Sequence, residues 1–130
     1  MATAMIDHSP DRSSVYKLVF SAGSQLHGAT AAFLASSVTG FPRANNATVA
    51  KIMSSYWISF VVAGNPNSLR ADDAPMWPSY INGGGGTVEN GEGVGFDTLS
   101  ITYSSIDVVG DPDASAQCDF FSSRGWTLRN

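Results

Sequence analysis

The stretch TVAKIMSSYWISFVVA, residues 48–63, decides the fold class of this chain of 130 residues. Its large apolar residues recur at alternating spacings of three and one, the pattern of an amphipathic helix with one wide buried face. That face consists of Val49, Ile52, Met53, Tyr56, Trp57, Phe60 and Val61. We therefore expect its aromatic side chains to pack in a hydrophobic core.

Both ends of this helix carry recognisable signals. Asn46 or Thr48 can cap the start, because either side chain offers an oxygen to the free backbone N–H groups of the first turn. Gly64 can end the helix, since glycine adopts the left-handed conformation that a C-cap requires. Pro66 then prevents continuation. The sequence thus predicts a helix over residues 48–63.

Strand patterns lie on both sides of the helix. Residues 15–20 alternate with both faces mostly apolar, which suits a strand inside a covered sheet. Residues 97–103 alternate with Leu99, Ile101 and Tyr103 on one face, and residues 106–109 form a further short strand pattern. Residues 29–35 are rich in alanine and favour a short helix. We therefore predict an α/β fold.

Composition excludes several classes of protein. Hydrophobic residues make up 43% and charged residues 14%, so the chain is not of the disordered type. The net charge of −4 disfavours nucleic acid as a partner, because phosphate binding needs a basic face. The sequence contains no run of 18 apolar residues, so it predicts no membrane-spanning helix. Residues 1–14 are expected to be a loose lead-in without the features of a signal peptide, so localisation stays open.

His27 is the candidate catalytic residue. It follows the strand of residues 15–20, precedes Gly28, and lies on a strand-to-helix loop, where a general base is often found. Its natural partner, a serine in a Gly-x-Ser-x-Gly turn, does not occur in these 130 residues. His8, His27 and Cys118 are too few and too scattered for a metal site. No cofactor is expected, because the glycines near residue 93 lack the strand and helix of a dinucleotide fingerprint.

Short motifs along the chain resemble, in their order and spacing, the C-terminal portion of the type-B carboxylesterases, the family of cholinesterases and fungal lipases. The final Cys-Asp-Phe-Phe is most similar to the fungal members. The motifs are the strand of residues 15–20, His27-Gly28, Tyr56-Trp57-Ile58-Ser59-Phe60, Gly64-Asn65-Pro66-Asn67, Trp77-Pro78-Ser79-Tyr80, residues 99–101 and residues 118–121.

The resemblance implies a partial α/β-hydrolase fold over residues 15–130, with the C-terminal strands and helices of a larger, mostly parallel sheet. It implies hydrolysis of small carboxylic esters, with His27 as the base of a Ser, Glu or Asp, His triad. The family's serine, acid and oxyanion loop lie upstream of this portion, so we expect the chain to be inactive alone. Thr30 departs from the pattern, because many members carry an acidic residue there.

Two other functions stay open. The chain can be a non-catalytic interaction or scaffold protein derived from the esterase fold. It can also be a small independent esterase that uses an unrecognised serine near His27, such as Ser24. The lone strand of residues 15–20 needs neighbouring strands, and the wide apolar face of the helix needs covering. We therefore expect a partial chain that is marginally stable alone, with Trp and Phe side chains exposed.

Two residues carry predictions about modification. Asn46 begins the triplet Asn46-Ala47-Thr48, a glycosylation sequence that would be used only in an exported protein. Cys118 is the only cysteine, so it is either a small buried apolar residue or half of a disulfide whose partner lies elsewhere.

Overall fold

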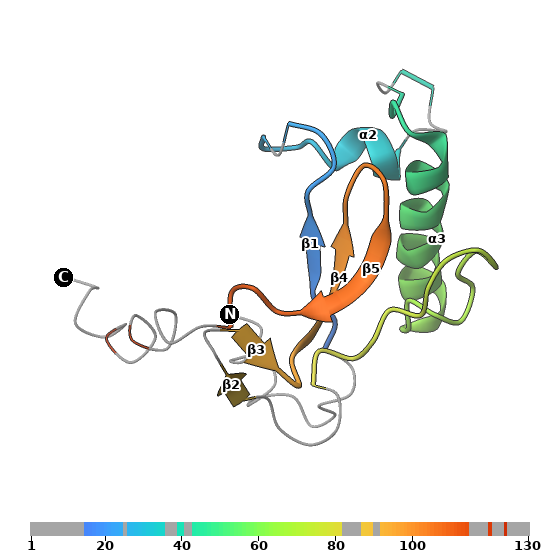
Figure 1. The fold of residues 1–130 in the computed structure, drawn as a ribbon. Helices are drawn as coiled ribbons and strands as arrows, with labels where there is room; N and C mark the ends of the chain where they lie inside the picture. Colours follow the sequence, from blue (N-terminus) through green and yellow to red (C-terminus); the bar gives the residue numbers. More distant parts are fainter. Residues whose placement is uncertain are drawn as a thin grey trace. The chain divides into compact units, whose positions relative to one another are not determined.

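A computed structural model gives the fold of the chain (Figure 1). The residues that the structure describes are 15–24, 26–35, 39–40, 43–81, 87–89, 92–114, 120 and 124. Our predictions for residues 1–14, for Cys118 and for the Cys-Asp-Phe-Phe motif lie outside these residues, apart from Phe120.

Two helices and two small sheets make up the described part, which confirms the α/β class. The helices are α2 (Ala31–Leu34) and α3 (Ala47–Ala63). The strands are β1 (Leu18–Phe20), β2 (Thr87–Glu89), β3 (Glu92–Val94), β4 (Asp97–Ile101) and β5 (Ile106–Gly110). The chain divides into two compact units, which are residues 18–77 with 99–108, and residues 1–17, 78–98 and 109–130.

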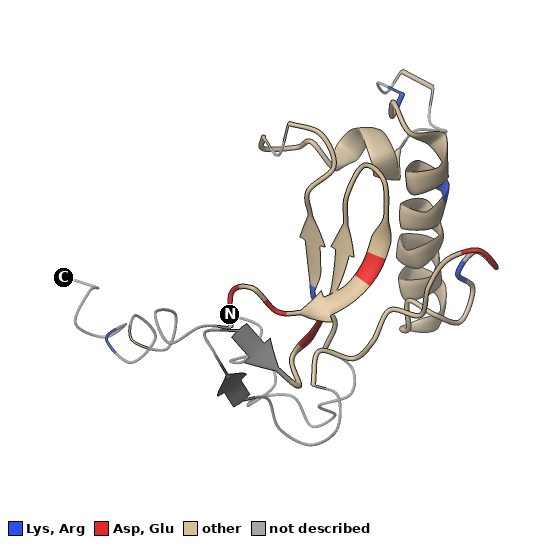
Figure 2. Cartoon of the chain, in the orientation of Figure 1, with Lys and Arg blue, Asp and Glu red and all other residues tan. Residues whose placement is uncertain are grey.

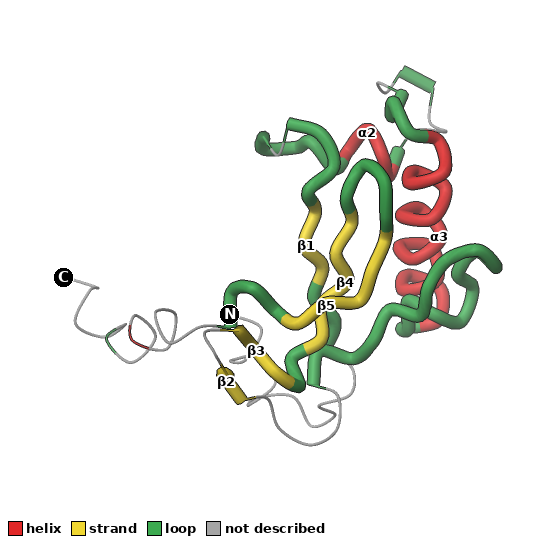
Figure 3. The backbone as a smooth tube through the Cα atoms, viewed as in Figure 1, coloured by secondary structure: helices red, strands yellow, loops and turns green. Residues whose placement is uncertain are grey.

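The first unit is built on α3, which ends where the sequence predicts and begins one residue earlier, at Ala47. The Asn46 side chain accepts a hydrogen bond from the Val49 N–H at 3.1 Å, so Asn46 is the cap and Thr48 is not. Gly64 adopts the left-handed conformation, with φ of 67°, and its N–H donates to the Phe60 carbonyl at 2.9 Å. Loop follows α3 as far as residue 80 (Figure 3).

The buried face of α3 differs from the predicted one in its second half. Val49, Ile52, Met53 and Tyr56 are buried as expected. Trp57, Phe60 and Val61, however, are 38%, 48% and 81% exposed, so their predicted core position is wrong. The reason is that the loop after α3 packs on the Ser59 side, where the hydroxyl donates to the Asn65 carbonyl and accepts from the Leu69 N–H. This exposure of Trp and Phe agrees with our expectation of uncovered apolar surface.

Strand β1 pairs with another strand of this chain. It pairs in parallel with β4, and the register places Leu18 opposite Leu99 and Phe20 opposite Ile101. Leu99 and Ile101 are fully buried, as their shared face predicted, whereas Tyr103 lies beyond the strand and is exposed. With β5 these strands form a mixed three-stranded sheet in the order β1-β4-β5.

The second unit contains a two-stranded antiparallel sheet and a small aromatic core. Strands β2 and β3 pair with Thr87 opposite Val94. The core joins Val15 and Tyr80 to the half-buried Ile81 and Phe96, and the rings of Tyr80 and Phe96 are 5.2 Å apart. Backbone bonds fix the arrangement, because the Tyr80 N–H donates to the Val15 carbonyl and the Asp97 N–H to the Tyr80 carbonyl.

Candidate functional site

The candidate catalytic histidine lies on the loop that leaves the carboxyl end of β1. The Ser21 N–H donates to the Ile101 carbonyl at 2.7 Å, which extends the parallel ladder by one bond before the chain turns away. His27 follows in a turn over residues 27–30, and α2 begins at Ala31. Parallel α/β sheets commonly form their binding sites at this end of the strands.

Gly28 explains why a glycine follows the histidine. Its φ is 80°, in the left-handed region that other residues rarely adopt. The turn is closed by hydrogen bonds from the Ala29 N–H to the Leu26 carbonyl and from the Ala31 N–H to the Gly28 carbonyl, both at 2.9 Å. The carbonyl of Thr30 then accepts from the Phe33 and Leu34 N–H groups, so Thr30 starts α2 through its backbone.

The His27 side chain is exposed. Among the described residues, no carboxylate or hydroxyl forms a hydrogen bond or ion pair with its imidazole. Ser24 is exposed on the same loop. The described residues therefore present a histidine in a catalytic type of position, without the acid that would fix its tautomer or a serine bonded to it.

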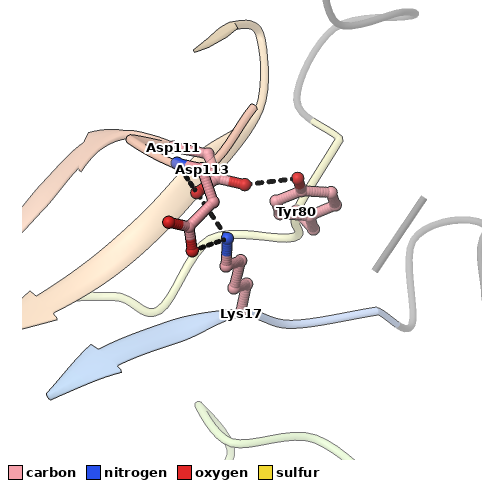
Figure 4. Close-up of polar contacts among 4 residues, drawn as sticks. All are labelled: Lys17, Tyr80, Asp111 and Asp113. Atoms are coloured by element: carbon pink, nitrogen blue, oxygen red, sulfur yellow. Dashed lines mark hydrogen bonds and ion pairs between the residues drawn. The ribbon is translucent and has the colours of Figure 1, made fainter. Parts of the chain in front are cut away.

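In the described part of the chain, other residues form a connected group of polar contacts (Figure 4). Asp111 is 1% exposed, and its carboxylate accepts from three donors. The Lys17 ammonium donates to Oδ1 at 2.5 Å, the Tyr80 hydroxyl donates to Oδ2 at 2.5 Å, and the Asp113 N–H donates to Oδ1 at 3.0 Å. Lys17 also donates to the Asp113 carboxylate at 2.8 Å. We call these four residues the Asp111 cluster.

Lys17 and its carboxylate partners stabilise one another's charged forms. Burial opposes ionisation of Asp111, but the bonds from Lys17, Tyr80 and the Asp113 backbone outweigh it and hold the pKa of this carboxyl below its usual value. Burial likewise disfavours the ammonium of Lys17, but the two carboxylates outweigh it and raise the pKa of Lys17. Asp111 and Lys17 are therefore both charged at neutral pH.

The order Asp111-Pro112-Asp113 is typical of a turn and of a helix start, and no sequence pattern identified the cluster. The turn is present, because the Ala114 N–H donates to the Asp111 carbonyl at 3.2 Å. One feature of the sequence does indicate an ion pair, because Lys17 is the single charged residue within an otherwise apolar strand pattern. A cation placed there needs a partner. Because both Asp111 oxygens accept hydrogen bonds, the cluster anchors the chain and does not offer a free base.

Asn46, the predicted glycosylation residue, has a structural role in the first unit. Besides capping α3, its side-chain amide donates to the Tyr103 carbonyl at 2.9 Å. A sugar on the same nitrogen would have to coexist with this bond. Glycosylation of Asn46 therefore stays a prediction, and its site is a helix cap that is half-buried.

Two features are absent from the described part of the chain. No three His, Cys, Asp or Glu residues lie close enough together there to hold a metal ion. Within the same residues, no helix has the length and apolar character needed to cross a membrane. Comparisons of the chain with protein-family models, curated proteins and solved structures give no match.

Proposed function

We propose that this chain is the C-terminal part of a serine carboxylester hydrolase of the type-B carboxylesterase family, a partial α/β-hydrolase fold in which His27 is the catalytic base. The observation that carries the proposal is the place of His27, on the loop between the carboxyl end of the parallel strand β1 and α2. An α/β-hydrolase puts its histidine on such a loop, late in the chain order. The order of the short motifs gives independent support.

In the proposed reaction, His27 acts on a serine that lies outside these 130 residues. The imidazole takes the proton of the serine hydroxyl as its oxygen attacks the ester carbonyl, and then gives this proton to the departing alcohol. Water, activated by the same imidazole, releases the acid from the serine. A carboxylate that also lies outside the described residues would orient His27. The chain alone is then inactive.

The test begins with the transcript upstream of Met1. We expect an in-frame segment with a Gly-x-Ser-x-Gly turn, and we expect the longer product to hydrolyse p-nitrophenyl butyrate. Replacement His27→Ala in that product should lower the rate by about a thousandfold or more, because it removes the general base. His8→Ala, which changes the other histidine of these 130 residues, is the matched control and should have no effect. A transcript without such a turn would contradict the proposal.

The same assay on the 130-residue chain tests an independent esterase that uses Ser24. Rates equal to those of buffer and free imidazole agree with the main proposal. A rate that His27→Ala and Ser24→Ala both abolish would instead make this chain an enzyme by itself.

A second candidate is a non-catalytic interaction protein built on the same fold. The exposed apolar second half of α3 favours it, as does the exposed His27, which has no bonding partner in the described part of the chain. On this view His27→Ala alters neither hydrolysis nor association in any length of product. Substitutions on the exposed face of α3 alter association alone. This pattern separates the two candidates.

A further inference from the structure

A pocket of about 420 Å³ lies on the exposed side of the first half of α3. It falls wholly within the first unit. Its lining includes Arg43, Ala47, Lys51, Ser54, Ser55 and Ile58. We call it the α3 pocket. Its volume lies in the range of pockets that hold small organic ligands, about 300–1,000 Å³.

The polar groups of the α3 pocket narrow the chemistry of a ligand. The Ser54 hydroxyl donates to the Phe33 and Leu34 carbonyls. The Ser55 hydroxyl donates to the Ile52 carbonyl and accepts from the Ala71 N–H. Both serines are therefore occupied, and the groups left to meet a ligand are cationic. Such a set of groups selects an anion.

Arg43 is the better placed of the two cations. Within the described residues, its guanidinium forms no hydrogen bond or ion pair. Its planar fork fits a carboxylate in a bidentate manner. The positive end of the α3 dipole lies close by, since Ala47 is the first residue of the helix and also lines the pocket.

Lys51 already has a partner, but a weak one. Its ammonium bonds to the Asp73 carboxylate at 3.1 and 3.2 Å, and the two side chains are 63% and 52% exposed. An exposed pair of this kind contributes little to stability. The ammonium has a third donor, and the same side chain lines the α3 pocket, so an anion there can share Lys51 with Asp73.

The other end of the α3 pocket is apolar. Ile58 lines it, and Val61 and Val62 follow at the next turn of the same helix side. These three side chains are 58%, 81% and 69% exposed. No charged residue occurs from Ile52 to Leu69, and the second half of α3 is uncharged in Figure 2. A ligand anchored at Arg43 would therefore meet aliphatic surface along its length.

From this juxtaposition we infer that the α3 pocket binds an aliphatic carboxylate, with its charged group at Arg43 and Lys51 and its chain along Ile58, Val61 and Val62. This inference does not depend on ester hydrolysis or on the role of His27. It needs only the residues of the first unit that line the pocket or follow it along α3.

The test uses sodium octanoate, kept below the concentration at which it forms micelles, and the 130-residue chain. Calorimetry measures affinity, and amide chemical shifts locate the site. We expect shifts at Ala47, Lys51 and Ile58, and weaker binding of butyrate and of octan-1-ol. Arg43→Gln and Lys51→Gln should each weaken octanoate binding by about threefold, and the double change by about tenfold. Arg43→Lys keeps the charge but loses the bidentate fork, so its affinity for octanoate should lie between those of the unaltered chain and Arg43→Gln.

Arg124→Gln is the control, because it removes the same charge outside the α3 pocket. Equal weakening by this control would mean that net charge alone attracts octanoate, and the inference would be overturned. Absence of binding, unaltered binding by the double variant, or equal affinity for octan-1-ol would overturn it too. Sedimentation with phosphatidylglycerol vesicles distinguishes the source of the anion. Binding to vesicles without binding to octanoate would point to a lipid surface and contradict a carboxylate pocket.

Discussion

The hydroxyl of Tyr80 donates a hydrogen bond of 2.5 Å to Oδ2 of Asp111, a carboxylate that is 1% exposed and lies 31 positions further along the chain. The other oxygen of the same carboxylate accepts from the Lys17 ammonium. The bond thus joins an aromatic core residue to an ion pair whose carboxylate is buried, within the second unit. Removing either donor leaves a buried charge with fewer partners, which is costly.

The first prediction concerns this bond. Tyr80→Phe keeps the ring packed against Phe96 but removes the donor, and we expect the free energy of unfolding to fall by about 2 kcal/mol, the usual size for a hydrogen bond to a charged group. Denaturation in urea, followed by circular dichroism, measures the loss. Tyr103→Phe is the control, because Tyr103 is exposed, and it should alter stability by less than about 0.5 kcal/mol. Equal effects of the two changes would contradict the anchoring role of Asp111.

The second prediction follows from the charge of Asp111. Its pKa is lower in the folded chain than the usual 3.8, so the carboxylate stabilises the fold above the unfolded pKa. This contribution is lost as the pH falls from 3.8 through the folded pKa. Asp111→Asn should be less stable at neutral pH and should lose less further stability on acidification. Urea midpoints measured from pH 7 down to pH 2 test this. Parallel pH curves for the two chains would show that Asp111 is not responsible.

The Asp111 cluster also shows where sequence reasoning stops. Lys17 and Asp111 are separated by 94 positions, and no local pattern fixes so distant a pairing. The cap and stop of α3 could be predicted, because Asn46 and Gly64 act on backbone groups within four residues of themselves. Helix caps can therefore be predicted from the sequence, because the groups involved are neighbours in the chain. For the long-range ion pair, the sequence shows only a lysine in an apolar strand and does not identify its partner.

The covered side of α3 is a second feature that the sequence did not predict. The spacing from Val49 to Val61 predicted a helix correctly, but not which side of its second half is covered. Ile58 and Val62 add a second apolar side to α3, so periodicity alone left two choices there. The covered side is set by where the loop after Gly64 returns, which depends on the bonds of the Ser59 hydroxyl to Asn65 and Leu69.

For the candidate site, sequence placed His27 on a strand-to-helix loop, and the structure has it between β1 and α2. Its chemical partners could not be predicted, because no residue near it in sequence is an evident acid or activated serine. The conformation of the His27 loop could be predicted from the sequence only in part. That Gly28 requires a left-handed backbone becomes evident once its φ of 80° is known.

The third prediction tests this backbone requirement. Gly28→Ala should lower the free energy of unfolding by about 1 kcal/mol, because alanine resists a positive φ. Nothing lies within 4 Å of the position that an added Cβ would take, so the cost is conformational and not steric. Gly110→Ala is the control, since Gly110 is not among the glycines with positive φ. Amide shifts of residues 26–31 should move in the first variant only. An unchanged loop at full stability would contradict the assigned turn.

The last prediction concerns the exposed apolar side of α3. Because Val61 and Val62 are 81% and 69% exposed and have no charged neighbour on the helix, we expect the chain to associate through them as its concentration rises. Val61→Lys with Val62→Lys should reduce this association, and it should alter the free energy of unfolding by no more than about 0.5 kcal/mol per site. Lysine near the end of a helix also interacts favourably with its dipole.

Sedimentation velocity over a range of concentrations measures the association, and urea denaturation measures the stability. Val108→Lys is the matched control, because Val108 is an exposed valine on β5. If it reduces association as much as the pair on α3, the apolar side of the helix is not the contact surface. If the variant with both lysines unfolds readily, Val61 and Val62 are covered in solution, and the apolar side assigned to α3 is incorrect.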